Sequence, residues 1–244
     1  VIPQRQRQSL LVQAIFSRPT EFADETFYDV SAFTLPLAYD LPYSSVKSVP
    51  DTGSELSLDT VAALVDERTM PASAGADAQQ QTIAFAVPWN QLNAPGFLQQ
   101  LLSNGVRVRI ASKAFQAQTP TQAVQFEPGD LLLPLGVQDS GTDLLKQMQE
   151  IHQQYPVQWH QLTQGRSLAG PDLGSGRMRV AREVKPVLVV GAGLSVYDAG
   201  EIWHFLDQRL GLSVTRAEWY RLARFPLNDY THLLMVSGDY SQLN

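Results

Sequence analysis

The pattern of apolar and polar positions is clearest in the last quarter of the chain, where it predicts a strand, a tight turn and a helix. The apolar run Pro186–Val190 leads into a turn at 191–193 with two glycines, and an amphipathic stretch follows up to Gly211. Further strands are expected at 212–215 and 232–236, the last of them apolar on both faces. This order of elements predicts an open, doubly wound α/β domain.

A strand pattern followed by a helix pattern also occurs earlier in the chain and predicts a second α/β body. Residues 82–87 and 106–110 have the pattern of strands, and residues 94–103 between them have the pattern of a helix. A strand–helix–strand unit of this kind builds parallel sheets. The fold class expected for the whole chain is therefore α/β, with open, mostly parallel sheets and flanking helices.

Three further elements are expected before the last domain. Short apolar runs at 124–126 and 131–133 flank a Glu-Pro-Gly-Asp turn, whose proline and glycine favour the dihedral angles of a tight turn, so we expect a β-hairpin. A helix is expected at 141–154, because Gly-Thr-Asp precedes an amphipathic stretch. A strand is expected at 157–162.

The first 81 residues have weaker patterns. A short helix is expected at 9–17 and an aromatic-rich, proline-punctuated extended stretch at 27–41. Residues 44–81 are rich in Ser, Asp, Ala, Gly and Gln, which indicates a surface insertion with one weak helix at 58–67.

The domain boundary is placed where the composition changes. Residues 164–185 are rich in Gly, Ser and Arg and have no apolar periodicity, so they are interpreted as a linker. An α/β accessory domain is expected at 1–163, with the insertion inside it, and a second domain at 186–244.

Composition excludes several classes of function for these residues. The chain has 244 residues, a net charge of −6 and no cysteine. An acidic chain of this kind is not expected to bind nucleic acid, which requires a basic face. No apolar run is long enough to span a membrane, and the polar residues 1–8 do not resemble a signal peptide. Without cysteine there is no disulfide, thiolate zinc site or cysteine nucleophile. The compartment stays open.

The glycine turn is the first candidate ligand site. Gly191, Gly193 and Ser195 would let a small anion approach the backbone at the amino end of a helix. A dinucleotide fingerprint is incomplete, because the third glycine would fall at position 196, which is Val. The alternative is structural: the glycines allow close strand–helix packing, and Ser195 or Asp198 caps the helix.

A possible polar pair is the second candidate. Glu201 and His204 are three residues apart on the expected helix, so they share a face and could act as an acid–base or metal pair. The alternative is that His204 lies at the margin of a buried side made by Ile202, Phe205, Leu206 and Leu210. No third ligand is identified, so no metal site is expected.

Two segments together resemble a known family. Residues 8–16 and 27–38, QSLLVQAIF and FYDVSAFTLPLA, and residues 189–204, VVGAGLSVYDAGEIWH, resemble the region after the catalytic domain in large bacterial proteins of the zinc carboxypeptidase family. In such proteins an α/β region follows the peptidase domain and runs into a domain similar to class I glutamine amidotransferases. The resemblance implies that residues 186–244 begin a flavodoxin-like domain, which would then be truncated at Asn244.

The catalytic residues of both families are missing from this chain. Zinc carboxypeptidases bind the metal through a His-x-x-Glu pair and a later His, and none of the four histidines is followed by Glu at the third position. The resemblance therefore implies zinc only in the peptidase domain and no cofactor in this segment. The cysteine nucleophile of the amidotransferases would lie beyond Asn244.

Three functions follow as alternatives. The preferred one is an accessory, noncatalytic region whose partner is the peptidase domain of the same protein. The others are a partial amidotransferase-like enzyme domain and a small-anion or ligand-binding module. A homo-oligomer is a further possible partner, because the strand at 232–236 would need a cover. It would be covered either by self-association or by folding of 185–244 onto the sheet of 82–163.

Overall fold

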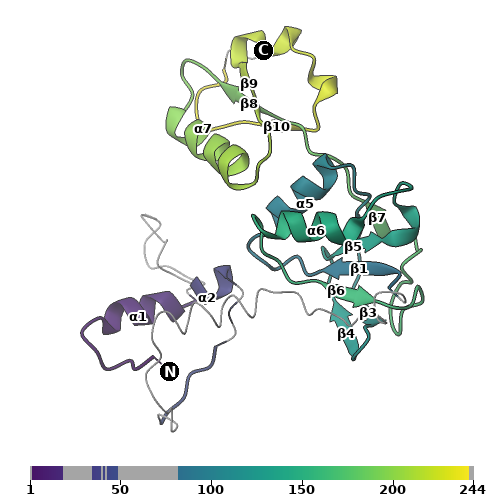
Figure 1. Ribbon diagram of the computed structural model, residues 1–244. Helices are drawn as coiled ribbons and strands as arrows, with labels where there is room; N and C mark the ends of the chain where they lie inside the picture. Colours follow the sequence, from purple (N-terminus) through teal and green to yellow (C-terminus); the bar gives the residue numbers. More distant parts are fainter. Residues whose placement is uncertain (1, 19–34, 40, 42, 49–81, 242–244) are drawn as a thin grey trace. The chain divides into compact units, whose positions relative to one another are not determined.

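The structure, a computed structural model, describes residues 2–18, 35–39, 41, 43–48 and 82–241 (Figure 1). The chain forms two compact units, Val1–Arg68 with Asn90–Leu92 and Thr69–Trp89 with Asn93–Asn244. Strands and helices are mixed in the second unit, which gives the chain a mixed α/β character. No helix within the described ranges is both long enough and apolar enough to span a membrane.

The first unit contains two short helices, α1 (Ser9–Phe16) and α2 (Leu35–Ala38). The helix predicted at 9–17 is confirmed. The extended stretch predicted at 27–41 is wrong over Leu35–Ala38, where Pro36 stands in the first helical turn and its missing N–H leaves no hydrogen bond unmade. Residues 27–34 of that stretch, the helix predicted at 58–67 and most of the insertion lie outside the described residues.

A five-stranded sheet with the order β6-β1-β5-β2-β7 is the largest element of the second unit (Figure 1). Its strands are β1 (Ala84–Val87), β2 (Arg109–Ala111), β5 (Leu131–Pro134), β6 (His160–Leu162) and β7 (Met178–Val180). All neighbouring strands are antiparallel, so the predicted parallel sheet is wrong for this region. Helix α5 (Ala94–Ser103) does return the chain so that β1 and β2 share a direction, but β5 lies between them.

The predicted hairpin is also wrong in its pairing. Strand β4 (Ala123–Phe126) pairs with β3 (Phe115–Gln118) in a separate two-stranded sheet, whereas β5 joins the five-stranded sheet. The turn at 127–130 does form: the Asp130 carboxylate accepts hydrogen bonds from the backbone N–H groups of Glu127 and Trp89, both at 2.8 Å. This turn directs the chain from one sheet into the other.

Different elements cover the two faces of the five-stranded sheet. Phe85 and Val87 pack on one face against α5 and α6 (Leu144–His152), and the short η1 helix (Leu135–Val137) follows β5. Ala84, Ala86 and Leu132 pack on the other face against the β3–β4 hairpin. Successive strand residues point to opposite faces, so burial of both faces explains the continuous apolar runs in these strands.

The segment predicted as a linker contributes to this body. Residues 164–185 supply β7, which pairs with β2 at the edge of the sheet. Leu173 and Met178 from the same segment are buried in the core between the sheet and the hairpin. The boundary between the predicted domains stays a prediction.

A three-stranded parallel sheet follows, with the order β10-β8-β9 (Figure 1). Its strands are β8 (Pro186–Val190), β9 (Thr215–Glu218) and β10 (His232–Leu234). Helix α7 (Val196–Trp203) and the π-helix η2 (His204–Arg209) join β8 to β9, and the 3₁₀-helices η3 (Trp219–Arg224) and η4 (Leu227–Asp229) join β9 to β10. The strand, turn and helix predicted from Pro186 onward are confirmed, and the strand predicted at 212–215 begins at Thr215.

The π-helix changes which side chains of this region are buried. The backbone N–H of Leu210 donates to the carbonyl of Phe205, five residues back, at 3.1 Å. A π turn is wider than an α turn and shifts the position of each later residue around the helix axis. Phe205, the second residue of the π-helix, is 55% exposed, although the α-helical pattern predicted it on the buried side with Ile202, Leu206 and Leu210.

Strand β10 lies at an edge, whereas the sequence pattern predicted an inner strand. Leu233 is 44% exposed. The strand does not join the five-stranded sheet, and folding of residues 185–244 onto that sheet stays a prediction. Self-association through this edge stays a prediction.

Candidate functional site at the glycine turn

The turn after β8 depends on two glycines. Gly191 and Gly193 have φ angles of 132° and 84°, which side chains rarely tolerate. A Cβ at position 191 would lie 2.7 Å from a carboxylate oxygen of Glu218 and 2.9 Å from the Trp219 ring. The indole N–H of Trp219 donates to the carbonyl of Ala192 at 3.0 Å. Gly191 therefore permits the end of β9 to pack against the turn.

Ser195 caps helix α7. Its hydroxyl oxygen accepts from the Asp198 N–H at 3.2 Å, and the hydroxyl donates to the Asp198 carboxylate at 2.7 Å. The second carboxylate oxygen of Asp198 accepts from the Ser237 N–H at 3.1 Å instead of returning to the Ser195 N–H. The predicted Ser195 cap is thus present, but the carboxylate connects the helix to the loop after β10.

The loops that follow β8 and β10 are joined directly. The Ser195 N–H donates to the Ser237 carbonyl at 2.8 Å, and the Asp239 N–H donates to the Gly193 carbonyl at 3.2 Å. A Cβ at Gly238 would lie 2.6 Å from the Gly193 carbonyl oxygen. Doubly wound sheets bind ligands in the crevice beyond the carboxyl ends of such strands. Here backbone and capping side chains fill that position.

The charge at this junction is negative. Hydrogen bonds from the Ser237 side chain, then from Ser195, lower the pKa of Asp198, and hydrogen bonds from Ser241 lower the pKa of Asp239. Both groups are therefore ionised at neutral pH, and the positive end of α7 faces a carboxylate of the chain itself. The small anion expected at Gly191, Gly193 and Ser195 stays a prediction, and this charge disfavours it.

The Asp198 hydrogen bonds predict a pH-dependent stability. Because the folded pKa lies below the ordinary value of 3.8, the stabilisation is complete above that pH and is lost as the pH falls through the folded pKa. Replacement of Asp198 by Asn should therefore lower the melting temperature at neutral pH, and the difference from wild type should shrink under acid conditions below the ordinary pKa. Thermal unfolding of wild type and variant from neutral pH to below the ordinary pKa of Asp measures this difference in melting temperature. A difference independent of pH would contradict the assignment.

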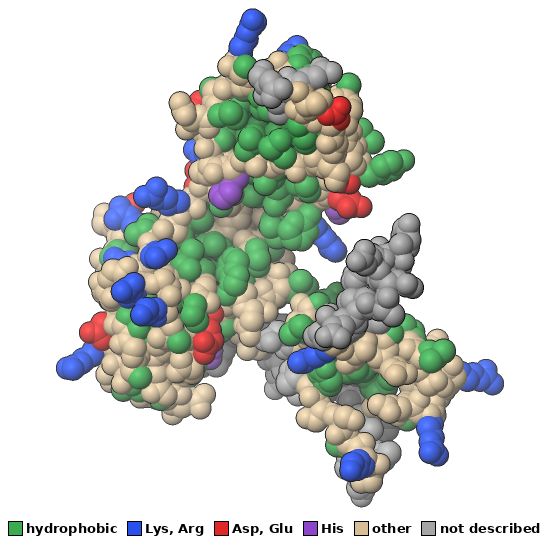
Figure 2. Space-filling view, turned by 180° about the vertical axis from the view of Figure 1, so that it is seen from behind, with side chains coloured by type: hydrophobic (Ala, Val, Ile, Leu, Met, Phe, Trp, Pro, Cys, Tyr) green, Lys and Arg blue, Asp and Glu red, His purple; other side chains and the backbone are tan. Residues whose placement is uncertain are grey.

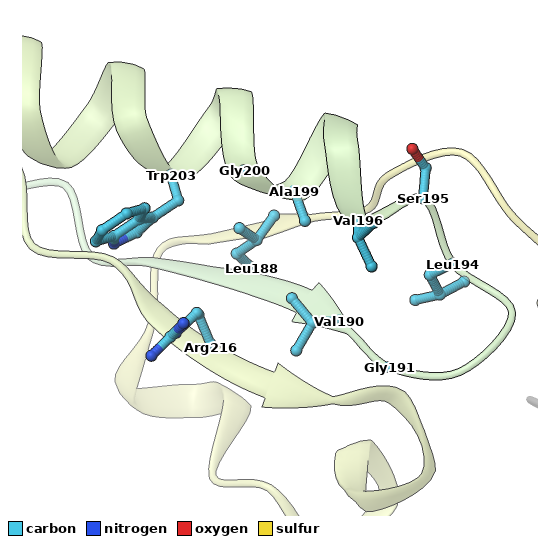
Figure 3. Close-up of a pocket in the computed structure, with 10 residues that line it drawn as sticks. All are labelled: Leu188, Val190, Gly191, Leu194, Ser195, Val196, Ala199, Gly200, Trp203 and Arg216. Carbon is cyan, nitrogen blue, oxygen red and sulfur yellow. The ribbon is translucent and has the colours of Figure 1, made fainter.

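A pocket of about 190 Å³ lies between α7, β8 and β9 (Figure 3). Figure 3 shows side chains from the helix facing the strands, with Trp203 and Arg216 towards one end and Leu194 towards the other. The pocket is lined by Leu188, Val190, Gly191, Leu194, Ser195, Val196, Ala199, Gly200, Trp203 and Arg216. Two of the three predicted ligand-binding residues, Gly191 and Ser195, therefore line a cavity, while Gly193 lies outside it.

The predicted polar pair is not brought together. Glu201 and His204 are both exposed, and no hydrogen bond or ion pair between their side chains is found in the described part of the chain. His204 is the first residue of the π-helix, and its place at the margin of a buried side stays a prediction.

Arg216 and Trp203 are the site residues that the sequence analysis did not assign. Arg216 pairs in register with Leu188 on β8, and Trp203 follows Val196 by seven residues, two helical turns. The available signal was the spacing of Val196, Ala199, Gly200 and Trp203, which places them along one side of a helix. The strand register that brings Arg216 opposite them has no local signature in the sequence.

The described residues contain no group of three or more His, Asp or Glu side chains that could hold a metal ion. Comparisons of the chain with protein-family models, with curated proteins and with solved structures give no match.

Proposed function

We propose that this chain is an accessory, noncatalytic α/β region of a zinc-carboxypeptidase-like protein. Its partner in this proposal is the peptidase domain of the same protein, which would hold the zinc. Residues 186–244 would begin a flavodoxin-like domain similar to class I glutamine amidotransferases. The resemblance of residues 8–16, 27–38 and 189–204 suggests the family, and two features of the structure support the role.

The strand order supports the flavodoxin-like part of the proposal. Numbered from β8, the sheet has the first strand in the centre, the second on one side and the third on the other. Flavodoxin-like sheets begin with this 2-1-3 order, and their strands are parallel. Strand order is a property of the fold and does not identify a reaction.

The joined loops after β8 and β10 are the observation that carries the noncatalytic role. In a 2-1-3 sheet the order reverses between these two strands, which makes their carboxyl ends the usual ligand position. The Ser195–Ser237, Asp198–Ser237 and Gly193–Asp239 hydrogen bonds close that position with the chain's own atoms. Such a junction is typical of a scaffold, and it supports a noncatalytic role for this position.

The role predicts that the isolated chain is inactive. It should release no C-terminal residues from peptides, release no ammonia from glutamine and hold no stoichiometric zinc, because it lacks both His-x-x-Glu and cysteine. Peptide chromatography, an ammonia assay and elemental analysis measure these three quantities, with an active zinc carboxypeptidase as the positive control. Turnover that a point substitution in this chain abolishes, or one tightly bound zinc per chain, would contradict the proposal.

The protein sequence encoded upstream and downstream of this chain distinguishes the accessory role from a partial amidotransferase-like enzyme domain. The strand order favours both alternatives. An upstream His-x-x-Glu with a later His is expected for the accessory role. A downstream cysteine at a strand-to-helix turn, without the upstream histidines, would favour the enzyme instead. A protein sequence with neither feature would overturn the family assignment.

A further inference from the structure

The pocket between α7 and β9 combines an apolar wall with one cation. Arg216 is the only charged residue among those that line it, and the others are apolar or small apart from Ser195. Binding sites for small molecules are commonly concave and apolar, with a few polar groups that fix the orientation of the ligand. The composition of this pocket therefore fits a ligand with an apolar body and one acidic group.

The guanidinium of Arg216 is available for such a group. It lies over the Trp203 ring, 5.9 Å from the ring centroid, which holds it at the pocket by a cation–π contact. No Asp or Glu of the described residues forms an ion pair with it. Two parallel N–H donors of a guanidinium match the two oxygens of a carboxylate.

The charge around the pocket orients the ligand. A carboxylate oxygen of Glu218 lies beside Gly191, 2.7 Å from where a Cβ would stand. An acidic ligand group is repelled from the Gly191 end and attracted to the Arg216 end. The apolar body of the ligand is then left against Leu188, Val190 and Ala199, which line the middle of the pocket.

A ligand that covers the apolar wall of the pocket removes exposed hydrophobic surface from water. Val196 is 74% exposed and Trp203 is 38% exposed, although both line the pocket. Hydrophobic side chains are also gathered on the visible face of the body that holds β8 to β10 (Figure 2). Removing such surface from water is favourable. The pocket volume of about 190 Å³ fits a small molecule.

We propose that this pocket binds small carboxylates with an aromatic or branched apolar body, with Arg216, held over the Trp203 ring, binding the carboxylate, and Leu188, Val190 and Ala199 contacting the body. The assignment is independent of the accessory role, because it concerns the groove beside α7 rather than the closed junction after β8 and β10. It also differs from the anion expected at the amino end of α7, where Asp198 lies.

Titration of the full 244-residue chain with benzoate tests the assignment. Benzoate is expected to shift the amide resonances of Val190, Ala199 and Arg216 saturably. Benzamide, its neutral isostere, should bind at least tenfold more weakly, because it lacks the charge that Arg216 recognises. Inorganic phosphate, which has no apolar body, should not compete at equal concentration. Equal binding of benzoate and benzamide, or full competition by phosphate, would overturn the proposal.

Two variants locate the site. Arg216→Gln should weaken benzoate binding at least tenfold, whereas the matched control Arg221→Gln should leave it unchanged, because Arg221 stacks over Tyr220 outside the pocket. Gly200→Leu should also abolish binding without unfolding the chain, since a Cβ at 200 meets no atom within 4 Å and leucine favours the helix. Equal effects of the two arginine variants, or full binding by a folded Gly200→Leu chain, would refute the assignment.

Discussion

Replacement of Phe97 by alanine should lower the free energy of unfolding of the five-stranded body by about 3–5 kcal/mol. Phe97 is completely buried in α5 and stacks on Trp159, with ring centroids 6.3 Å apart. The substitution removes the apolar burial of the ring and leaves a cavity between α5, α6 and the sheet, because the surrounding side chains relax only partly.

Urea unfolding followed by circular dichroism measures this loss, and amide exchange in β1 and β5 shows that it belongs to this body. Phe205→Ala is the matched control: the same side chain is removed from a position that is 55% exposed. Its effect should stay within about 0.5 kcal/mol. If Phe97→Ala lowers the free energy of unfolding as little as Phe205→Ala does, α5 does not pack on the sheet as described.

The sequence predicted elements best where local chemistry determines them. The bounds predicted for α5 agree with the structure at both ends. Asn104-Gly105 ends the helix, and in the structure Pro95 suits its first turn. Helix α6 begins where Asp143 caps it, with the Asp143 carboxylate accepting from the Lys146 N–H at 3.1 Å. These signals lie within a few residues of the elements that they determine.

Strand pairing was not predictable in the same way. A strand–helix–strand pattern indicates that β1 and β2 share a direction, which they do, but nothing local shows that β5 will lie between them. The apolar sequence pattern of β1 and β5 is the same whether the neighbouring strands are parallel or antiparallel, because both faces of the sheet are covered in either case. The error in the hairpin has the same origin, since β4 and β5 flank a good turn yet join different sheets.

In the candidate site, too, the features with a local sequence signal could be predicted, and those that depend on strand pairing could not. The glycines at 191 and 193 and the Ser195 cap could be predicted, because each is a local backbone requirement. The partners that determine what the turn does come from residues 216–239, and they reach it only through the parallel pairing of β8 with β9 and β10. The sequence therefore indicated a ligand position at the turn, whereas the hydrogen bonds to the loop after β10 and the pocket that Gly191 and Ser195 share with Arg216 could be found only in the structure.

The closed junction predicts a large effect from one added methyl group. Gly238→Ala should destabilise the three-stranded body by about 2–4 kcal/mol. Gly238 has a φ of 155°, and its Cβ would lie 2.6 Å from the Gly193 carbonyl oxygen and 2.8 Å from the Leu194 Cα. Both contacts are with backbone, which cannot turn aside as a flexible side chain can. The loops after β8 and β10 would have to separate, and the Asp239–Gly193 hydrogen bond would be lost with the contact.

Gly193→Ala is the control that isolates the contact from the dihedral strain. Gly193 also has a positive φ, 84°, but a Cβ there meets no atom within 4 Å. Its substitution should cost only the strain of an alanine in the left-handed region, about 1 kcal/mol. Urea unfolding of both variants, with amide exchange at Ser195 and Asp239 as the local reporter, measures the difference. If Gly238→Ala costs no more than Gly193→Ala and Asp239 keeps its protection, the two loops are not joined, and the noncatalytic role loses the observation that carries it.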